Sequence, residues 1–261
     1  MARAIDSSTD SSIDSYIEGQ MEDSENTGAR HRCLVVLGMH RSGTSCLTGM
    51  VEQCGVNLGE VFTKNPFNQK GNRESASIQA INNAVLEQNG GAWNQPVLAT
   101  DWGASLRRDR DTILNELIPQ DGGWWGFKDP RVVFTLPFWI EATGDPHFIA
   151  TFRHPHRVAL SLNQRDGLAL KDGFELWRQY NVQLLRWITE FEIPLVDFDL
   201  NDENYRRDVA SKLGRVGLSG ADSETFFDAS LRHQSSVELD HASLPEHILD
   251  VYRELKARHH A

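Results

Sequence analysis

Short apolar runs alternate with segments of helical spacing along most of the chain. Residues 33–37, "CLVVL", form a continuous apolar run of the length expected for a buried strand. Further short strands are predicted at residues 124–129, 147–152 and 193–198. Each run is followed by a polar or glycine-containing segment, as is usual where a strand ends and a loop begins.

The segments between these strands have the spacing of helices. A helix is predicted from the first glycine-rich turn to Gly55, and others over residues 75–89 and 103–118. Asp172 with Glu175 three residues later matches a capping box, which predicts the start of a long helix there. The apolar residues of that helix recur with the period of one buried face, at Trp177, Tyr180, Leu184, Trp187 and Phe191. Residues 57–74 form a polar loop, and helices follow the last strand.

Alternating strands and helices predict an α/β domain of P-loop type, in which helices flank both faces of a central parallel sheet. Residues 31–261 contain no linker that would divide this domain. Ligands bind beyond the carboxyl ends of the strands in such sheets. Three motifs fall at predicted strand ends, at residues 38–45, 127–131 and 152–162. The sequence therefore predicts that they converge on one site.

Residues 1–30 differ in composition from the rest of the chain. They contain seven acidic and two basic residues, a net charge of −5 out of the −11 of the whole chain. Few apolar residues accompany these charges, which predicts a disordered tail. The remaining domain is mildly acidic, whereas a protein that binds duplex nucleic acid normally has a basic surplus. Nucleic acid is therefore not an expected partner.

Three sequence patterns are absent: a membrane helix, a signal peptide and a metal-ligand spacing of cysteines. No stretch approaches the ~20 apolar residues of a membrane helix, and the first 30 residues lack the pattern of a signal peptide, so we expect a cytoplasmic protein. The three cysteines, Cys33, Cys46 and Cys54, lack metal-ligand spacing and are expected to be reduced, buried thiols. No metal is expected.

The turn after the first strand reads "GMHRSGTS", residues 38–45. It has the two glycines and the final Ser45 of a phosphate-binding loop, but Thr44 stands where that loop has lysine. Backbone N–H groups around Ser42, Gly43, Thr44 and Ser45 would form an anion-binding nest at a helix start. Arg41 supplies the cation from within the loop. The alternative is a simple glycine-containing turn between strand and helix.

The segment "HRSGTS" resembles the 5′-phosphosulfate-binding loop of sulfotransferases that use 3′-phosphoadenosine 5′-phosphosulfate (PAPS) as donor. These enzymes bind the donor's 3′-phosphate with an arginine at a strand end and a serine eight residues later. Arg153 and Ser161 in "FRHPHRVALS" have that spacing. The resemblance implies that PAPS is the co-substrate, that 3′-phosphoadenosine 5′-phosphate (PAP) is the product, and that Arg41 to Ser45 hold the phosphosulfate.

The segment "GFKDPR" is similar to one in tyrosine-sulfating and many bacterial sulfotransferases. In the tyrosine-sulfating enzymes its lysine helps to stabilise the transition state. Lys128 occupies that position. Charge grows on the bridging oxygen as the phosphate leaves, and a preorganised donor there can lower the barrier by ~3 kcal/mol. Arg41 and Lys128 are the two candidates for this role. Asp129 and Arg131 are expected to shape the turn instead.

An acceptor hydroxyl also needs a base within hydrogen-bond reach. The resemblance implies a glutamate after the first helix, and the segment "NPFNQKGNRE" is similar to "NP-x-G-x-WE" of bacterial relatives, with Arg73 in place of the aromatic residue. Glu74 is the first candidate and Glu60 the second. His154, beside Arg153, is a third.

The resemblance covers residues 32–236 and ends in "FFDASLRHQSS", from which Arg232 and His233 could approach the nucleotide. It implies transfer of a sulfuryl group from PAPS to an acceptor hydroxyl, possibly of a carbohydrate or small molecule, with lipid and peptide tyrosine also open. A P-loop nucleotide kinase and a non-catalytic nucleotide-binding module are the alternatives.

Overall fold

The computed structural model describes residues 31–64, 71–219 and 244–260. The predicted acidic tail, residues 1–30, lies outside the described residues, as do residues 65–70 of "NPFNQKGNRE" and the whole of "FFDASLRHQSS" with Arg232 and His233. Expectations for these segments stay predictions.

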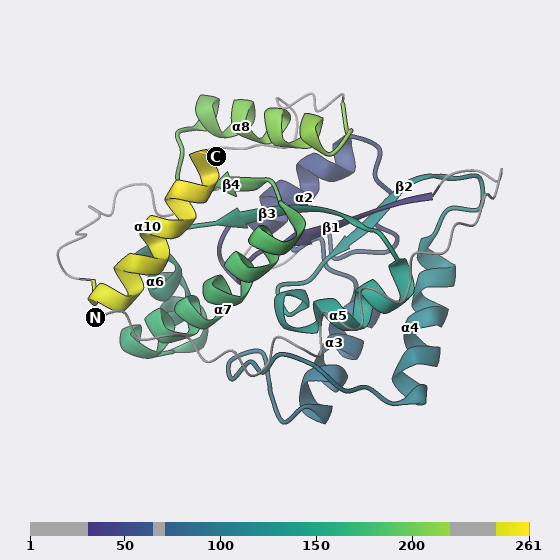
Figure 1. Cartoon of the computed structure of the whole chain (residues 1–261), viewed down its shortest axis with the longest axis horizontal. Helices are drawn as coiled ribbons and strands as arrows, with labels where there is room; N and C mark the ends of the chain where they lie inside the picture. Colours follow the sequence, from purple (N-terminus) through teal and green to yellow (C-terminus); the bar gives the residue numbers. More distant parts are fainter. Residues whose placement is uncertain (1–30, 65–70, 220–243, 261) are drawn as a thin grey trace. The chain divides into compact units, whose positions relative to one another are not determined.

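A four-stranded parallel sheet lies at the centre of the domain (Figure 1). Its strands are β1 (His31–Leu37), β2 (Gly123–Lys128), β3 (His147–Phe152) and β4 (Leu195–Asp197), in the order β2-β1-β3-β4. The four predicted strands are thus confirmed. The chain leaves β1 for β2 on one side and later returns to β3 on the other. Such a reversal of direction opens a crevice beyond the carboxyl end of β1, where ligands bind in α/β proteins.

Eight helices are assigned among the described residues. They are α2 (Thr44–Gln53), α3 (Ala76–Gln88), α4 (Ala104–Leu117), α5 (Val132–Thr143), α6 (Pro155–Asp166), α7 (Leu170–Phe191), α8 (Asp202–Arg215) and α10 (Glu246–His260). Most of these helices have an exposed polar side that gives the sequence a helical period. Most residues of α5 are buried, so its sequence is a nearly continuous apolar run without that signal.

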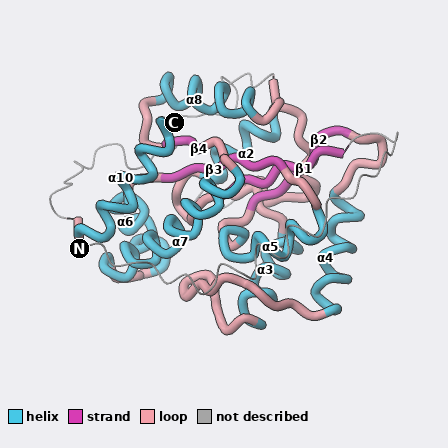
Figure 2. Tube along the Cα trace, viewed as in Figure 1, coloured by secondary structure: helices cyan, strands magenta, loops and turns pink. Residues whose placement is uncertain are grey.

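Alternate residues of the strands point to two separate hydrophobic clusters. In β1, Leu34 and Val36 pack with α2 and α8, whereas Val35 and Leu37 pack with α3, α4, α5 and α7. This period of two is the geometry of a strand buried on both faces. Figure 2 shows α8 on one side of the sheet and α5 and α7 on the other. The predicted sheet with helices on both faces is confirmed.

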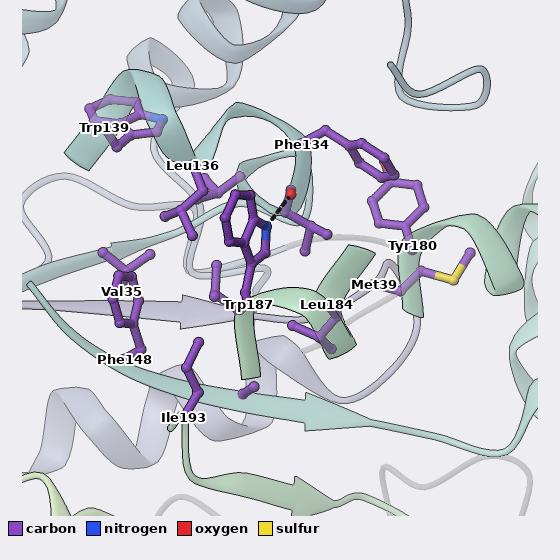
Figure 3. Packing of buried hydrophobic residues seen from close by; sticks show 14 of the residues in the cluster. Val35, Met39, Phe134, Leu136, Trp139, Phe148, Tyr180, Leu184, Trp187 and Ile193 are labelled. Carbon is purple, nitrogen blue, oxygen red and sulfur yellow. Dashed lines mark hydrogen bonds between the residues drawn. The ribbon is translucent and has the colours of Figure 1, made fainter. Parts of the chain in front are cut away.

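The larger cluster contains several aromatic side chains whose N–H or O–H groups form hydrogen bonds. Figure 3 shows Trp187 of α7 among these side chains, where its indole N–H donates to the carbonyl oxygen of Val133, 2.8 Å away. The rings of Phe134 and Tyr180 meet edge to face with centroids 4.9 Å apart. Because Trp187 and Tyr180 belong to α7 and their partners to α5, these contacts fix the two helices together. Both are therefore core residues, as the helical spacing predicted.

The predicted capping box at Asp172 is wrong. Helix α7 begins at Leu170 after Ala169, so Asp172 lies inside the first turn. Glu175 pairs with Arg178 at 2.6 Å. A carboxylate in the first turn is stabilised by the helix dipole without capping the helix, and the two arrangements give the same sequence pattern.

Three expectations from the sequence concern the cysteines, metal ions and membrane helices. All three cysteines are free; the expected burial is confirmed for Cys33 but is wrong for Cys46 and Cys54, which are only partly buried. In the described part of the chain, no group of three or more His, Cys, Asp or Glu side chains is arranged to hold a metal ion. Within the same residues, no helix combines the length and the apolar character needed to cross a membrane.

We predict that Gly126→Ala destabilises the fold, because a Cβ at this position of β2 would lie 2.2 Å from the carbonyl oxygen of Leu34 in β1. Relieving this contact must disturb the β1–β2 pairing, at a cost of at least about 2 kcal/mol in urea unfolding. The matched control is Gly214→Ala in α8, where a Cβ meets no atom within 4 Å. This control should gain up to about 1 kcal/mol from helix propensity. Equal unfolding midpoints for the two variants would contradict the close strand packing.

Candidate functional site

The loop between β1 and α2 is held in a conformation that only certain residues adopt. Gly43 has φ 86° and forms the N-cap of α2, and a Cβ there would lie 2.2 Å from the ring of Phe198. Arg41 also has a positive φ, 65°. Gly43 therefore allows the ring of Phe198 to approach the backbone closely and allows a left-handed backbone conformation, and these two requirements explain the glycine in the loop pattern.

The start of α2 presents open hydrogen-bond donors. The N–H groups of Cys46 and Leu47 donate to the carbonyl oxygen of Gly43, which leaves those of Gly43, Thr44 and Ser45 without helical acceptors. No side chain caps this helix, and its first turn holds no acidic residue. The hydroxyl of Ser42 is buried and has no hydrogen-bond partner among the described residues. These donors and the helix dipole favour an anion.

Arg41 joins this loop to the segment after β3. Its Nε donates to the hydroxyl of Ser161 at 2.6 Å, and Nη1 of Arg153 donates to the carbonyl oxygen of Arg41 at 3.3 Å. Burial, and then the positive charge of Arg165, lower the pKa of Arg41. The structure thus brings together the residues predicted for the two phosphates, although Arg41 and Ser161 are 120 positions apart.

Arg153 follows β3 directly, and its side chain is almost fully buried. Its guanidinium lies over the ring of Phe198, 5.2 Å from the centroid, and its Nε is 3.5 Å from Oδ1 of Asp199. Burial lowers the pKa of Arg153 to about 10, and the carboxylate of Asp199 is the largest opposing influence. Arg153 therefore keeps its positive charge at neutral pH.

A buried ion pair lies on the other side of the loop. Nζ of Lys128, at the carboxyl end of β2, donates to Oε1 of Glu74 at 2.6 Å and to the hydroxyl of Ser45 at 3.3 Å. Gln79 of α3 donates to the second carboxylate oxygen of Glu74. Lys128 thus connects the first candidate base to the anion-binding loop. Both carboxylate oxygens of Glu74 have a fixed donor, so its orientation is well defined.

Backbone contacts hold Glu74 in this position. The N–H of Phe62 donates to the carbonyl oxygen of Glu74, and the N–H of Arg73 donates to that of Phe62. Arg73 has a positive φ of 54°, and its side chain pairs with Glu52 of α2 at 2.8 Å. The residue that replaces an expected aromatic side chain therefore anchors the loop to α2.

The other two candidate bases lie elsewhere. Glu60 is exposed in the loop after α2. Within the described residues, no hydrogen bond or ion pair joins it to Lys128 or to the anion-binding loop. His154 is fully buried; its Nδ1 accepts from the N–H of His156 at the start of α6, and its ring meets that of Tyr252. The side chain of His154 thus acts in helix capping and packing.

Asp129 and Arg131 form the turn after β2, as expected. Arg131 donates to both carboxylate oxygens of Asp129, at 3.0 and 2.9 Å. Asp129 also accepts the backbone N–H of Arg131 at 2.8 Å. Because the two charges satisfy each other, neither is the first choice for a substrate contact.

Two features of the site escaped sequence reasoning. The end of β4 places Phe198 and Asp199 against Gly43 and Arg153, and it could have been found as the fourth strand end of the predicted sheet. His40 is buried within the loop, between the rings of Trp93 and Tyr180, and its Nε2 has no partner among the described residues. Burial, and then the nearby charges of Arg131 and Arg165, hold the pKa of His40 well below its usual range.

The fold can be compared with known proteins. No protein-family model and no curated protein matches the sequence. The structure is similar to the sulfotransferase domain from the curacin biosynthetic pathway, with a TM-score of 0.52, 11% identity, and coverage of 88% of this chain and 99% of that one. It is also similar to the sulfotransferase domain from the Synechococcus PCC 7002 olefin synthase, with a TM-score of 0.53, 12% identity, and coverage of 90% and 98%.

The similarity to these two solved domains agrees with an α/β protein with a parallel sheet. More narrowly, the chain has the fold seen in bacterial sulfotransferase domains. The resemblance drawn from its sequence motifs is thereby confirmed at the level of fold.

We predict that Glu74 and Lys128 are energetically coupled. Lys128→Met and Glu74→Gln should each cost about 3 kcal/mol in urea unfolding, since each leaves a buried charge without its partner. The double variant should cost about 1–3 kcal/mol less than the sum of the single variants.

The matched control is the exposed pair of Glu203 and Arg207 in α8, for which we expect no measurable coupling. Additive effects for Lys128 and Glu74 would show that the two charges do not depend on each other.

Proposed function

We propose that the protein transfers a sulfuryl group from PAPS to a hydroxyl of a carbohydrate or small-molecule acceptor. The observation that carries this proposal is the convergence on Arg41 of the anion-binding loop, Arg153 and Ser161. Two groups of phosphate ligands in direct contact suit a nucleotide with phosphates on both sides of one ribose. An ATP site would instead have a lysine in place of Thr44.

In this proposal the residues around Arg41 bind the donor. The N–H groups of Gly43, Thr44 and Ser45 receive the 5′-phosphosulfate, while Arg153 and Ser161 receive the 3′-phosphate. A guanidinium can donate two parallel hydrogen bonds to a phosphate, which makes Arg153 the principal contact. The sulfotransferase fold of the chain supports this assignment but does not by itself define the donor.

The chemistry in this proposal takes place at Glu74 and Lys128. The acceptor oxygen forms a bond to sulfur, and the bond between sulfur and the bridging oxygen breaks. The electron pair of that bond stays on PAP, and the acceptor proton passes to Glu74. Lys128 and Arg41 stabilise the negative charge that grows on the bridging oxygen, each by ~3 kcal/mol. The contact between Lys128 and Ser45 supports this role, because it places the ammonium group beside the loop.

We predict that calorimetry will show tighter binding of PAP than of 5′-AMP, which lacks the 3′-phosphate. Charge-assisted contacts to that phosphate should contribute at least about tenfold in affinity. Arg153→Gln should remove most of this preference, whereas Arg186→Gln, at an exposed arginine of α7, should retain it. Tight binding of ATP-Mg without binding of PAP would instead indicate a nucleotide kinase.

We further predict that turnover requires Glu74. Acceptors can be found by incubating cell extracts with PAPS carrying radioactive sulfur and identifying the labelled product. With such an acceptor, Glu74→Gln should lower turnover by about 10²- to 10⁴-fold while PAP affinity stays within about twofold. The matched variant Glu60→Gln should have near-normal turnover. Near-normal turnover of Glu74→Gln would exclude this residue as the base, and PAP binding without any labelled product would indicate a binding module.

A further inference from the structure

Asp199 is an acidic residue beside two arginines of the candidate site, Arg153 and Arg157. It lies two residues beyond the end of β4, and its side chain is mostly buried. Oδ1 of Asp199 accepts from Nη1 of Arg157 at 2.8 Å and lies 3.5 Å from Nε of Arg153. Oδ2 accepts from the backbone N–H of His154 at 2.6 Å. All three donors belong to the segment between β3 and the first turn of α6.

These donors are the kind that bind a phosphate. Two guanidinium groups and a backbone N–H beside a helix start make charge-assisted bonds to any oxyanion of suitable size. The same segment is assigned to the 3′-phosphate in the proposed function, on which this inference rests. The carboxylate of Asp199 therefore uses donors that a 3′-phosphate would also need.

The position of Asp199 is fixed by its neighbours. Its backbone N–H donates to Oδ1 of Asp197 at 2.9 Å, and Oδ2 of Asp197 accepts from Nζ of Lys256 in α10 at 2.6 Å. Phe198, between the two acids, packs against Gly43 and beneath the guanidinium of Arg153. The carboxylate cannot turn to solvent without losing its bonds to Arg157 and to the backbone N–H of His154.

We propose that Asp199 is a specificity-determining residue that competes with the substrate's 3′-phosphate for Arg153 and Arg157. Its negative charge opposes the bound phosphate and lowers affinity for the bisphosphate product PAP. A ligand without the 3′-phosphate does not meet this competition. Asp199 thereby limits the affinity of the site for 3′-phosphorylated nucleotides, PAPS and PAP alike, and speeds dissociation of the product PAP.

The test is calorimetry of Asp199→Asn with PAP and with 5′-AMP. The amide keeps the size of the side chain and an oxygen for the N–H of His154, but it removes the charge. PAP should bind about tenfold more tightly than to the natural protein, since a charge a few ångströms from the phosphate is lost. Affinity for 5′-AMP should change less than about twofold, because that ligand does not reach Asp199.

Two further variants control for folding and for net charge. Asp199→Ser supplies a smaller neutral acceptor and should shift the ratio of PAP to AMP affinity in the same direction. Glu203→Gln removes one negative charge from an exposed ion pair in α8 and should leave the ratio unchanged. Thermal unfolding of each variant shows whether the protein tested is folded.

The affinities for PAP and 5′-AMP distinguish failure of the proposal for Asp199 from failure of the proposed function. An unchanged ratio in both Asp199 variants, or parallel weakening of both ligands, would overturn the proposal, because Asp199 would then act only in the structure. If the natural protein shows no preference for PAP over AMP, the assignment of the 3′-phosphate fails, and the proposed function fails with it. That result is separate from one in which the natural protein prefers PAP and Asp199→Asn does not alter the preference.

Discussion

The hydrogen bonds made by Arg41 are the contact on which the site depends. Its side chain binds Ser161 and its carbonyl oxygen accepts from Arg153, so one residue joins the loop after β1 to the segment after β3. Parallel strands make this possible, because their carboxyl ends meet at one edge of the sheet. The loop has positive φ at Arg41 and at Gly43, a backbone conformation that few non-glycine residues adopt.

The ion pair of Lys128 and Glu74 adds the second half of the site. Burying two charges is costly, and apolar residues of similar size often give equal or greater stability. Such a pair is therefore better explained by chemistry than by stability. It gives a carboxylate of fixed orientation and an ammonium group beside Ser45, the two groups that the proposed sulfuryl transfer requires. On the other side of the loop, Asp199 pairs with Arg157 and lies near Arg153, which leaves that side with an excess of positive charge.

Much of this arrangement was predictable from local sequence. The four strands, the loop over residues 38–45 and the pair Arg153 and Ser161 all leave signals within a few residues. The contact between Arg41 and Ser161 and that between Lys128 and Glu74 join distant segments, so the sequence named their members but not their pairing. Asp199 belongs to no recognised spacing, the loop motif contains His40 without indicating that its side chain is buried, and α5 is too apolar to show a helical period. The solved sulfotransferase domains share the fold at 11–12% identity, which shows how little of it depends on particular residues.

A crystal structure of the protein with PAP would show directly whether one nucleotide contacts both segments. We expect the 5′-phosphate on the N–H groups of Gly43, Thr44 and Ser45, and the 3′-phosphate within hydrogen-bond distance of Arg153 and Ser161. Glu74 and Lys128 should lie on the 5′ side of the same nucleotide. PAP bound with its two phosphates away from these groups, or with only one of them in contact, would contradict the claim that both segments hold one molecule.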